Sequence, residues 1–429
     1  MKRRWTAAVI ASAAIVALAG CTTPAADSDG PTDLSGVTLT MWVAQASATL
    51  AEQPATAFEE ATGATVELVV VPDPYEGTIP TRLATGEKPD LAFYQPTVSA
   101  LPVIQPATNL LPLDGEPWVE NLGPAEQGLG IIDGVRYAAI VKSPSISGVY
   151  YNKAAFEAAG ITEMPQSYDE LVEVAAQIKA ATPDVAPFYE AGGDKWPVQW
   201  HLHSLLSGVL DESFWADLNK NEASWTDPRF VDAVAKYQAD IIEGGLSQAA
   251  YQTGTFEEQA AALTDGSAAM VFQVDAILGL LLANLSVDEL NEQIGWFPIA
   301  SGGPNSQFVA DQTNGVVAFK TGDSAREAAA KQFLSFWLGE NYPAFIEANN
   351  YPSIQPSVPS PAGLPEVTVA QAESLATGTG MWYLYALTAP DIHLYLNDML
   401  FGTKTPEQVG QAMEDQFIQI AKAQGAPGF

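Results

Sequence analysis

Alternating apolar and polar residues near the start of the chain predict short strands separated by helices. Residues 37–43 and 65–71 each have the composition of a strand, and a helical stretch over 48–62 lies between them. A helix over 78–85 and a third strand over 89–94 follow. This strand–helix–strand–helix–strand order is typical of a parallel α/β sheet with right-handed crossovers.

Later segments continue the mixture of strands and helices. Strands are predicted over 136–141 and 147–152, and a short helix over 152–159. Helix starts are marked by possible capping boxes at Ser167–Glu170 and Ser324–Glu327 and by the Asp-Pro and Thr-Pro pairs at 227–228 and 405–406. The apolar run 276–285 is too short for a membrane span and predicts a core helix.

The first 21 residues carry an export pattern. Lys2, Arg3 and Arg4 precede the apolar stretch 7–19, and the sequence Leu-Ala-Gly at 18–20 leads into Cys21, the single cysteine of the chain. This order resembles a bacterial lipobox. The resemblance implies that residues 1–20 are a signal peptide and that Cys21 is lipidated after cleavage, whereas the alternative is an uncleaved anchor helix with an incidental cysteine. Two or more acyl chains would hold the protein firmly on the outer face of the cytoplasmic membrane.

Composition narrows the class of protein. Residues 21–35, rich in small and polar side chains, predict a flexible tether. The net charge of −33, which loss of the basic leader makes more negative, argues against nucleic acid as a partner. Charged residues make up 16% and hydrophobic residues 47%, so we expect a globular chain. Once Cys21 is lipidated, no thiol remains for a disulfide, a metal site or catalysis.

Motifs for enzymatic chemistry are not evident. His201 and His203 are two residues apart on a predicted helix and point in different directions, and His393 stands alone, so we expect no metal or other cofactor. The chain has no G-x-S-x-G elbow and no phosphate-binding loop. We therefore predict that the protein is not an enzyme. Two carboxylates from distant segments could still form a glycosidase site, and that alternative stays open.

Aromatic residues suggest a site for a small polar ligand. Trp42 and Tyr94 end the first and third strands, where open α/β sheets bind ligands. Trp196 and Trp200 lie just after the Gly-Gly-Asp-Lys loop at 192–195. Trp382 lies just after Gly-Thr-Gly at 378–380. Flat aromatic faces pack against sugar rings, while amides and carboxylates bond the hydroxyl groups. The alternative for each is an ordinary core or surface aromatic.

Five ordered motifs resemble a known family. They are Leu-Ala-Thr-Gly-Glu-Lys-Pro-Asp-Leu at 83–91, Asp-Gly-Val-Arg-Tyr at 133–137, Tyr-Asn-Lys with Phe and Ala-Gly at 151–160, Met-Pro-Gln-Ser-Tyr-Asp-Glu-Leu at 164–171, and Leu-Thr-Asp-Gly-Ser-Ala-Ala-Met at 263–270. The chain thereby resembles the extracellular solute-binding proteins of ABC importers, the family that includes maltose-binding protein. The family often has Gly-x-Trp after the last motif, and here Gln273 and Asp275 take those two positions.

The resemblance implies a fold and a division of the chain. We expect an α/β, two-lobe, type II periplasmic-binding-protein-like fold with a ligand cleft between the lobes. The N-terminal lobe would comprise 36–146 and 298–319, and the C-terminal lobe 147–297 and 320–429. Crossings are expected near 145–149, 296–299 and 318–321, with hinge residues beside them.

We expect capture of a solute by lobe closure and its delivery to permease subunits in the membrane. The candidate ligand-binding residues are Trp42, Gln45, Tyr94, Gln95, Trp196, Trp200, Gln273, Asp275, Asn314 and Trp382. The aromatics favour a carbohydrate, and the scattered arginines argue against an anion clamp. We expect a monomer. The alternatives are a surface lipoprotein glycosidase and a sensor or adhesion lipoprotein without a transport role.

Overall fold

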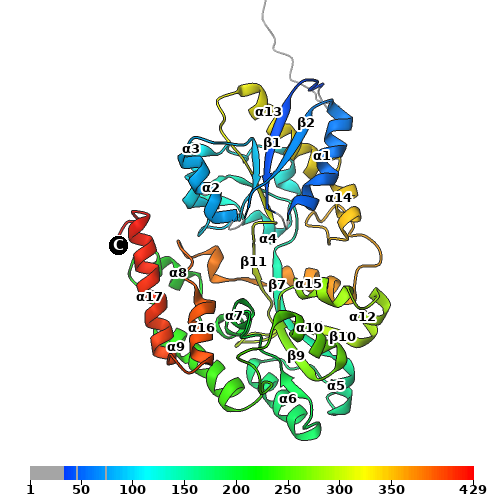
Figure 1. Cartoon of the computed structure of the whole chain (residues 1–429), viewed down its shortest axis with the longest axis vertical. Coiled ribbons are helices and arrows are strands. Elements are labelled where there is room, and N and C mark those ends of the chain that lie inside the picture. The colour runs from blue at the N-terminus through cyan, green and yellow to red at the C-terminus, as the bar shows by residue number, and fades with distance from the viewer. Residues whose placement is uncertain (1–32, 45–46, 73–74) are drawn as a thin grey trace, which may run out of the picture. The chain divides into compact units, whose positions relative to one another are not determined.

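Two β-sheets organise the part of the chain that the structure describes. This computed structural model describes residues 33–429 except 45–46 and 73–74. The first sheet has the strand order β2-β1-β3-β12-β6, and the second has the order β13-β11-β7-β9-β8 with β10 beside β7. Helices flank both sheets (Figure 1), and Asp33–Phe429 forms one compact unit. The expected mixture of helices and sheets is therefore present.

The first sheet combines early and late segments of the chain. Its strands are β1 (Thr38–Val43), β2 (Thr65–Val70), β3 (Leu91–Phe93), β6 (Ala138–Ile140) and β12 (Gly315–Ala318). The first three are parallel, with Met41 opposite both Leu68 and Leu91, as the strand–helix rhythm predicts. β12 runs antiparallel between β3 and β6. A strand from residues beyond 300 thus completes a sheet that begins at residue 38.

Helices from two distant parts of the chain cover this sheet. They include α1 (Ala48–Thr62), α2 (Tyr75–Ala84), α13 (Ser324–Leu338) and α14 (Tyr342–Asn349), with short turns η1 (Leu101–Ile104), α3 (Pro106–Asn109), η2 (Pro117–Asn121) and α4 (Pro124–Gln127). The ring centroids of Phe58 and Phe333 lie 5.2 Å apart, and those of Phe93 and Trp337 lie 6.1 Å apart. Trp337 is fully buried.

The second sheet is centred on one long strand. Its members are β7 (Ser145–Asn152), β8 (Ala186–Phe188), β9 (Ala268–Gln273), β10 (Ile294–Phe297), β11 (Gln307–Val309) and β13 (Thr379–Gly380), and a separate hairpin joins β4 (Ile131–Ile132) to β5 (Val135–Arg136). β7 pairs antiparallel with β9, β10 and β11. Gly148 on β7 lies under Trp296 of β10, and a Cβ atom there would come within 2.5 Å of the indole ring.

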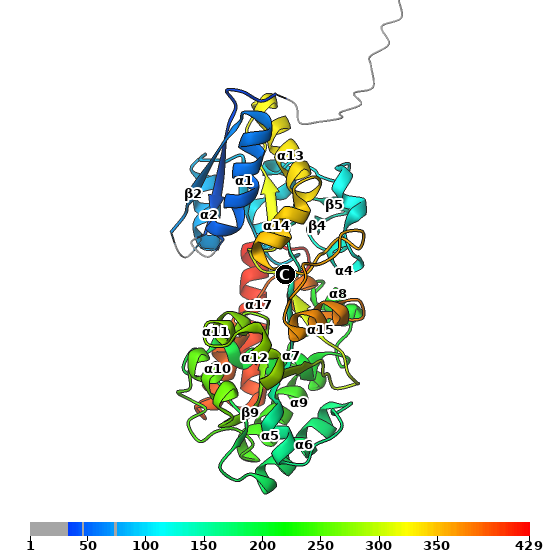
Figure 2. The same cartoon turned by 90° about the vertical axis from the view of Figure 1, so that its right-hand side faces the viewer.

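The remaining helices surround the second sheet. They are α5 (Lys153–Ala158), α6 (Tyr168–Ala181), η3 (Trp196–Val198), α7 (Gln199–Leu206), α8 (Glu212–Leu218), α9 (Pro228–Tyr237) with its π-helical continuation η4 (Gln238–Glu243), α10 (Phe256–Asp265), α11 (Ile277–Leu282), α12 (Val287–Gln293), α15 (Glu366–Leu375), η5 (Trp382–Leu384), α16 (Ile392–Leu400) and α17 (Pro406–Ala423). Figure 2 shows α5, α6 and α9 at the end away from α13. The expected helix starts at Pro228 and Pro406 are confirmed.

Two capping details differ from expectation. At α6 the Ser167 hydroxyl accepts a hydrogen bond from the Glu170 amide, but the Glu170 carboxylate accepts from the Gln166 amide instead of Ser167. The box predicted at Ser324 is wrong, because Asp323 is the N-cap and accepts from the amides of Ala325 and Arg326. The helix therefore begins one residue earlier than predicted, and the Asp323 carboxylate in place of the Ser324 hydroxyl accepts the hydrogen bonds of the first free amides.

The chain passes between the sheets at other points than we expected. One passage lies between β6 and β7, close to the expected 145–149. Both β10 and β11 belong to the second sheet, so the next passage lies between 309 and 315 instead of 296–299. Helices α13 and α14 pack against α1 beside the first sheet, although the expected boundaries place 320–349 with the second. Local pattern could not show this, because an amphipathic helix can cover either sheet. The division into two lobes stays a proposal.

Candidate functional site

An open hollow lies where α2, the end of β3 and the loop before β12 meet. Glu76, Gln95, Asp311, Gln312 and Thr313 line a volume of about 390 Å³. Gln95 was predicted as a site residue because it follows the third strand. The carboxylates and amides of this hollow are suited to hydrogen-bonding a small polyhydroxylated molecule. We call this region the Asp311 hollow.

A network of local hydrogen bonds holds Asp311 in place. Its Oδ1 accepts from the amide and the hydroxyl of Thr313, at 2.7 and 2.6 Å. Asn314 Oδ1 accepts from the Asp311 amide at 2.6 Å, while Asn314 Nδ2 donates to the Ser143 carbonyl at 2.6 Å. Gln95 Nε2 donates to the Ala310 carbonyl at 2.9 Å. The loop is therefore fixed to the passage between β6 and β7 as well as to the end of β3.

The electrostatics of the hollow are acidic. The Glu76 side chain reaches solvent, yet the protein around it and the charge of Asp311 raise its pKa. Burial and the Glu76 charge likewise raise the pKa of Tyr94, which keeps that hydroxyl neutral. An anionic ligand would meet like charges here, whereas neutral hydroxyl groups can donate hydrogen bonds to both carboxylates.

Asp275, which the sequence singled out, lies near this loop. Ser145 Oγ donates to Asp311 Oδ2 at 3.4 Å. Burial raises the pKa of Asp275, while Lys142 and a hydrogen bond with Ser145 lower it and Asp311 raises it further. Ser145 thus stands between two carboxyl groups that come from different segments. The structure brings Gln95, Asp275 and Asn314 together around the same passage of chain.

Trp42 and Tyr94 lie close together at the carboxyl ends of β1 and β3 in the first sheet. Both are 2% exposed and share one hydrophobic cluster with Phe319, whose ring centroid is 6.5 Å from that of Trp42. The Arg82 guanidinium lies 5.2 Å from the centre of the Trp42 ring. The Tyr75 hydroxyl donates to the carbonyls of Trp42 and Phe93. Their aromatic faces are packed against protein in this conformation.

Trp196, Trp200 and Trp382 belong to a second aromatic group. The ring centroids of Trp196 and Trp200 are 6.1 Å apart, and His203 lies 5.7 Å from Trp200 and 6.4 Å from Trp382. Trp200 and Trp382 are buried, whereas Trp196 is partly exposed and packs against Phe256 at 4.8 Å. Trp196 is the one of the three whose side chain retains an accessible surface.

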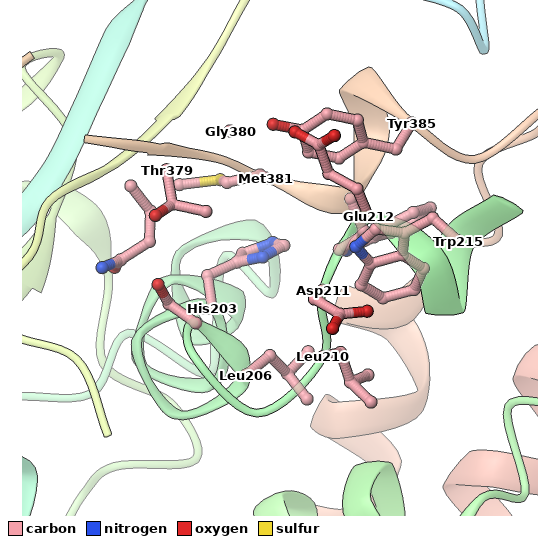
Figure 3. Close-up of a pocket in the computed structure, with 13 residues that line it drawn as sticks. His203, Leu206, Leu210, Asp211, Glu212, Trp215, Thr379, Gly380, Met381 and Tyr385 are labelled. Atoms are coloured by element: carbon pink, nitrogen blue, oxygen red, sulfur yellow. The ribbon is translucent and has the colours of Figure 1, made fainter. Parts of the chain in front are cut away.

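A small hollow adjoins this aromatic group. His203 lies in it near Met381, Thr379 and Glu212 (Figure 3). Burial lowers the pKa of His203 to about 3, so its ring is neutral. The volume of about 40 Å³ is room for a few water molecules and not for a sugar ring.

Of the remaining predicted residues, two are fully buried and two lie outside the described part of the chain. Gln273 is fully buried, and its amide donates to Gln259 Oε1 at 3.0 Å. Asn314 is fully buried and acts through the backbone bonds described above. Gln45 and Cys21 lie outside the described residues. Contact of the predicted residues with a ligand stays a prediction.

Sequence reasoning missed Glu76, Asp311, Thr313 and Ser145. The sequence Asp311-Gln-Thr-Asn314 has the composition of a turn stabilised by aspartate and asparagine side chains, and it could have drawn attention to this loop. Glu76 gave no such signal, because its partner Asp311 is more than 200 residues away in the chain. Only the fold brings these two carboxylates to one hollow.

The described residues contain neither a metal-binding cluster nor a membrane-spanning helix. Within the described residues, no group of three or more His, Cys, Asp or Glu side chains is arranged to hold a metal ion. The helices among those residues include none that is long and apolar enough to cross a bilayer.

Comparison with protein families and curated proteins gives consistent matches. The family model of the bacterial extracellular solute-binding proteins matches residues 45–342. A diacetylchitobiose-binding protein of Streptomyces coelicolor is 25% identical over 455 residues, covering 97% of this chain and 98% of that protein. Putative binding proteins of Brucella abortus are 27% identical over 76% of this chain and 75% of theirs.

Solved structures resemble the whole described body. A chitin oligosaccharide binding protein has a TM-score of 0.72 at 22% identity, covering 89% of this chain and 98% of that one. An open conformation of a putative binding protein from Bacillus subtilis has a TM-score of 0.73 at 19% identity, covering 92% and 100%. At these identities the likeness concerns the fold.

Proposed function

Because the chain belongs to the family of bacterial extracellular solute-binding proteins, we propose that it captures a sugar or short oligosaccharide and delivers it to an ABC importer. The expected fold class is confirmed as the type II periplasmic-binding-protein fold. The matching family and relatives are described as binding proteins, in agreement with the expectation of a non-enzymatic protein.

The observation that carries this proposal is the Asp311 hollow. Its carboxylates, amides and hydroxyl present many acceptors and several donors to a solute, and among the described residues no cationic side chain lines it. A neutral polyhydroxylated ligand satisfies such a surface, because each hydroxyl both donates and accepts. Names of relatives support the same class, since they mention diacetylchitobiose and chitin oligosaccharides.

Closure of the two proposed lobes would complete the site. In this conformation the Asp311 hollow is open and Trp196 is partly exposed, so both are available to a ligand. A ligand that contacts both lobes only in a closed form shifts the population toward that form. The other candidates either contact the ligand directly or hold the residues that do: these are Trp42, Tyr94, Gln45, Trp200, Gln273 and Trp382. A closed, loaded form is what a permease would recognise.

Membrane attachment through Cys21 is part of the proposal. The lipobox pattern would place the protein outside the cytoplasmic membrane as a lipid-anchored monomer. This location supports transport, because a tethered binding protein stays close to the permease that accepts its solute.

A thermal-shift screen tests the proposed function. The panel contains monosaccharides and short malto-, xylo- and chitooligosaccharides, together with glucuronate as an anionic probe. Binding raises the melting temperature by mass action. We expect at least one neutral sugar to raise it with saturation and glucuronate to leave it unchanged. A screen in which no sugar stabilises the protein would refute carbohydrate capture.

A further inference from the structure

The small hollow around His203 is lined by polar atoms that the protein itself does not bond. Its lining residues come from the end of α7, the start of α8, β11, β13 and η5 (Figure 3), and we call it the His203 hollow. Four of them each have a buried polar atom without a hydrogen-bond partner among the described residues. These atoms are His203 Nε2, Ser207 Oγ, Gln307 Oε1 and Trp382 Nε1. Buried polar atoms are almost always hydrogen-bonded, so four of them around one hollow point to a ligand there.

These four side chains are almost completely buried. The exposed fractions are 4% for His203, 6% for Ser207, 2% for Gln307 and 2% for Trp382. Gln307 is also fixed in place, because its Nε2 donates to the carbonyls of Ile299 and Asn305 at 3.2 and 2.6 Å. Its Oε1 cannot change places with Nε2 without breaking those two bonds. A partner for these atoms must therefore lie in the hollow itself.

The size of the hollow limits the ligand to very small molecules. Its volume is about 40 Å³. On the same measure one water molecule needs roughly 10–15 Å³, and it needs two to four polar partners. The four unbonded atoms supply such partners. The hollow therefore has the space and the hydrogen-bonding groups for roughly two or three water molecules.

The charges around the hollow favour a neutral ligand over an ion. Burial lowers the pKa of His203 to about 3, so its ring is uncharged at neutral pH. Among the described residues that line the hollow, the charged side chains are Asp211 and Glu212, and both are exposed. Asp211 Oδ1 already accepts a hydrogen bond from the Ser213 hydroxyl at 2.6 Å. A buried anion would lack a cationic partner, and a buried cation would face the N–H donor of Trp382.

We infer that the His203 hollow binds a cluster of roughly two or three ordered water molecules as a lasting part of the fold. Water both donates and accepts, so one cluster can accept from the indole N–H of Trp382 and donate to Gln307 Oε1. The Ser207 hydroxyl can do either, and Nε2 of the neutral His203 ring bonds water in either tautomer. The cluster thereby joins α7 to β11 and η5, which come from much later in the chain. This water site is separate from the proposed sugar site.

A high-resolution crystal structure of the full chain tests this inference directly. We expect ordered water oxygens in the hollow at hydrogen-bond distance, about 2.7–3.2 Å, from Trp382 Nε1 and His203 Nε2. Crystals held under xenon gas provide the contrast, because xenon enters dry apolar cavities and not hydrated polar ones. Xenon in the hollow, a hollow without ordered solvent, or a bound ion in place of water would overturn the inference.

Filling the hollow provides a second test in solution. Ser207→Val puts methyl groups into the space, whereas the matched control Ser207→Ala removes the hydroxyl and leaves the space open. Oxygen-17 relaxation dispersion counts the water molecules that stay bound for long times. We expect at least one fewer in Ser207→Val than in wild type and an unchanged count in Ser207→Ala. Equal counts in all three proteins would contradict the water site. If Ser207→Val fails to fold, the wild-type crystal structure decides alone.

Discussion

The buried carboxyl group of Glu126 makes the stability of this protein depend on pH. Glu126 on α4 is 3% exposed, and burial raises its pKa from an ordinary value of 4.5 to about 7. The folded state therefore binds this proton more tightly than the unfolded state. Its contribution to stability is full below about pH 4.5 and is lost as the pH rises through about 7.

Glu126→Gln should remove the loss of stability that the wild-type protein shows as the pH rises. The amide stays neutral, so we expect the variant to be more stable than wild type at pH 8 by up to roughly 3 kcal/mol. At pH 4 the two proteins should be similar. Urea unfolding at both pH values measures the difference, and a variant that is less stable than wild type at pH 8 would contradict the buried, proton-binding carboxyl.

Substitutions of Trp42 and Trp196, two predicted ligand contacts, should affect stability and binding differently. Trp42→Ala removes a ring that is 2% exposed, so a loss of about 3–5 kcal/mol of stability is expected whatever its role with ligand. Trp42→Phe keeps an aromatic ring at lower cost. Trp196→Ala removes a partly exposed ring and should weaken sugar binding about tenfold while the protein stays folded.

Affinities from calorimetry and melting temperatures of each variant separate these effects. Unchanged affinity in both Trp42→Phe and Trp196→Ala would remove these residues from the set of ligand contacts.

At the scale of elements, the pairing of β7 with β10 depends on a close approach. The Trp296 ring lies over Gly148, where a Cβ atom would come within 2.5 Å of it. Gly148→Ala should cost about 1–3 kcal/mol because the indole must move in a packed core. Gly115→Ala is the control, since nothing lies within 4 Å of its Cβ position. Equal melting temperatures for the two variants would disprove the close packing.

Elements with a strong local signal were predictable from sequence. β1 and β2 agree with alternating patterns to within one residue, and Asp227 and Thr405 cap their helices because their side chains can bond nearby amides. Positions set by long-range packing were not predictable. Asp311 faces Glu76, and α13 packs on α1, only because distant segments fold together.

At the scale of the whole molecule, export and anchoring are predicted to depend on Cys21. Cys21→Ser should release the protein from the membrane fraction, because the acyl chains have no attachment point. Thr22→Ala is the control and should stay membrane-bound. Fractionation of cells and labelling with a fatty acid provide the readout. Retention of Cys21→Ser in the membrane would favour an uncleaved anchor helix instead.

Capture by closure predicts a change in dimensions. A sugar that bridges the proposed lobes should reduce the radius of gyration measured by small-angle scattering, because contacts made only in the closed form stabilise it. A non-binding sugar from the same panel is the control. An unchanged radius at saturating sugar would contradict closure even if the sugar binds.

The central claim is that the Asp311 hollow binds a neutral sugar, and calorimetric titration tests it most directly. The most stabilising sugar from the screen is titrated into wild type, Asp311→Asn and the control Asp184→Asn, whose carboxylate is exposed and lies outside the site. We predict saturable one-to-one binding to wild type and Asp184→Asn, with affinity for Asp311→Asn reduced about tenfold or more. Equal affinity in all three proteins would contradict this account.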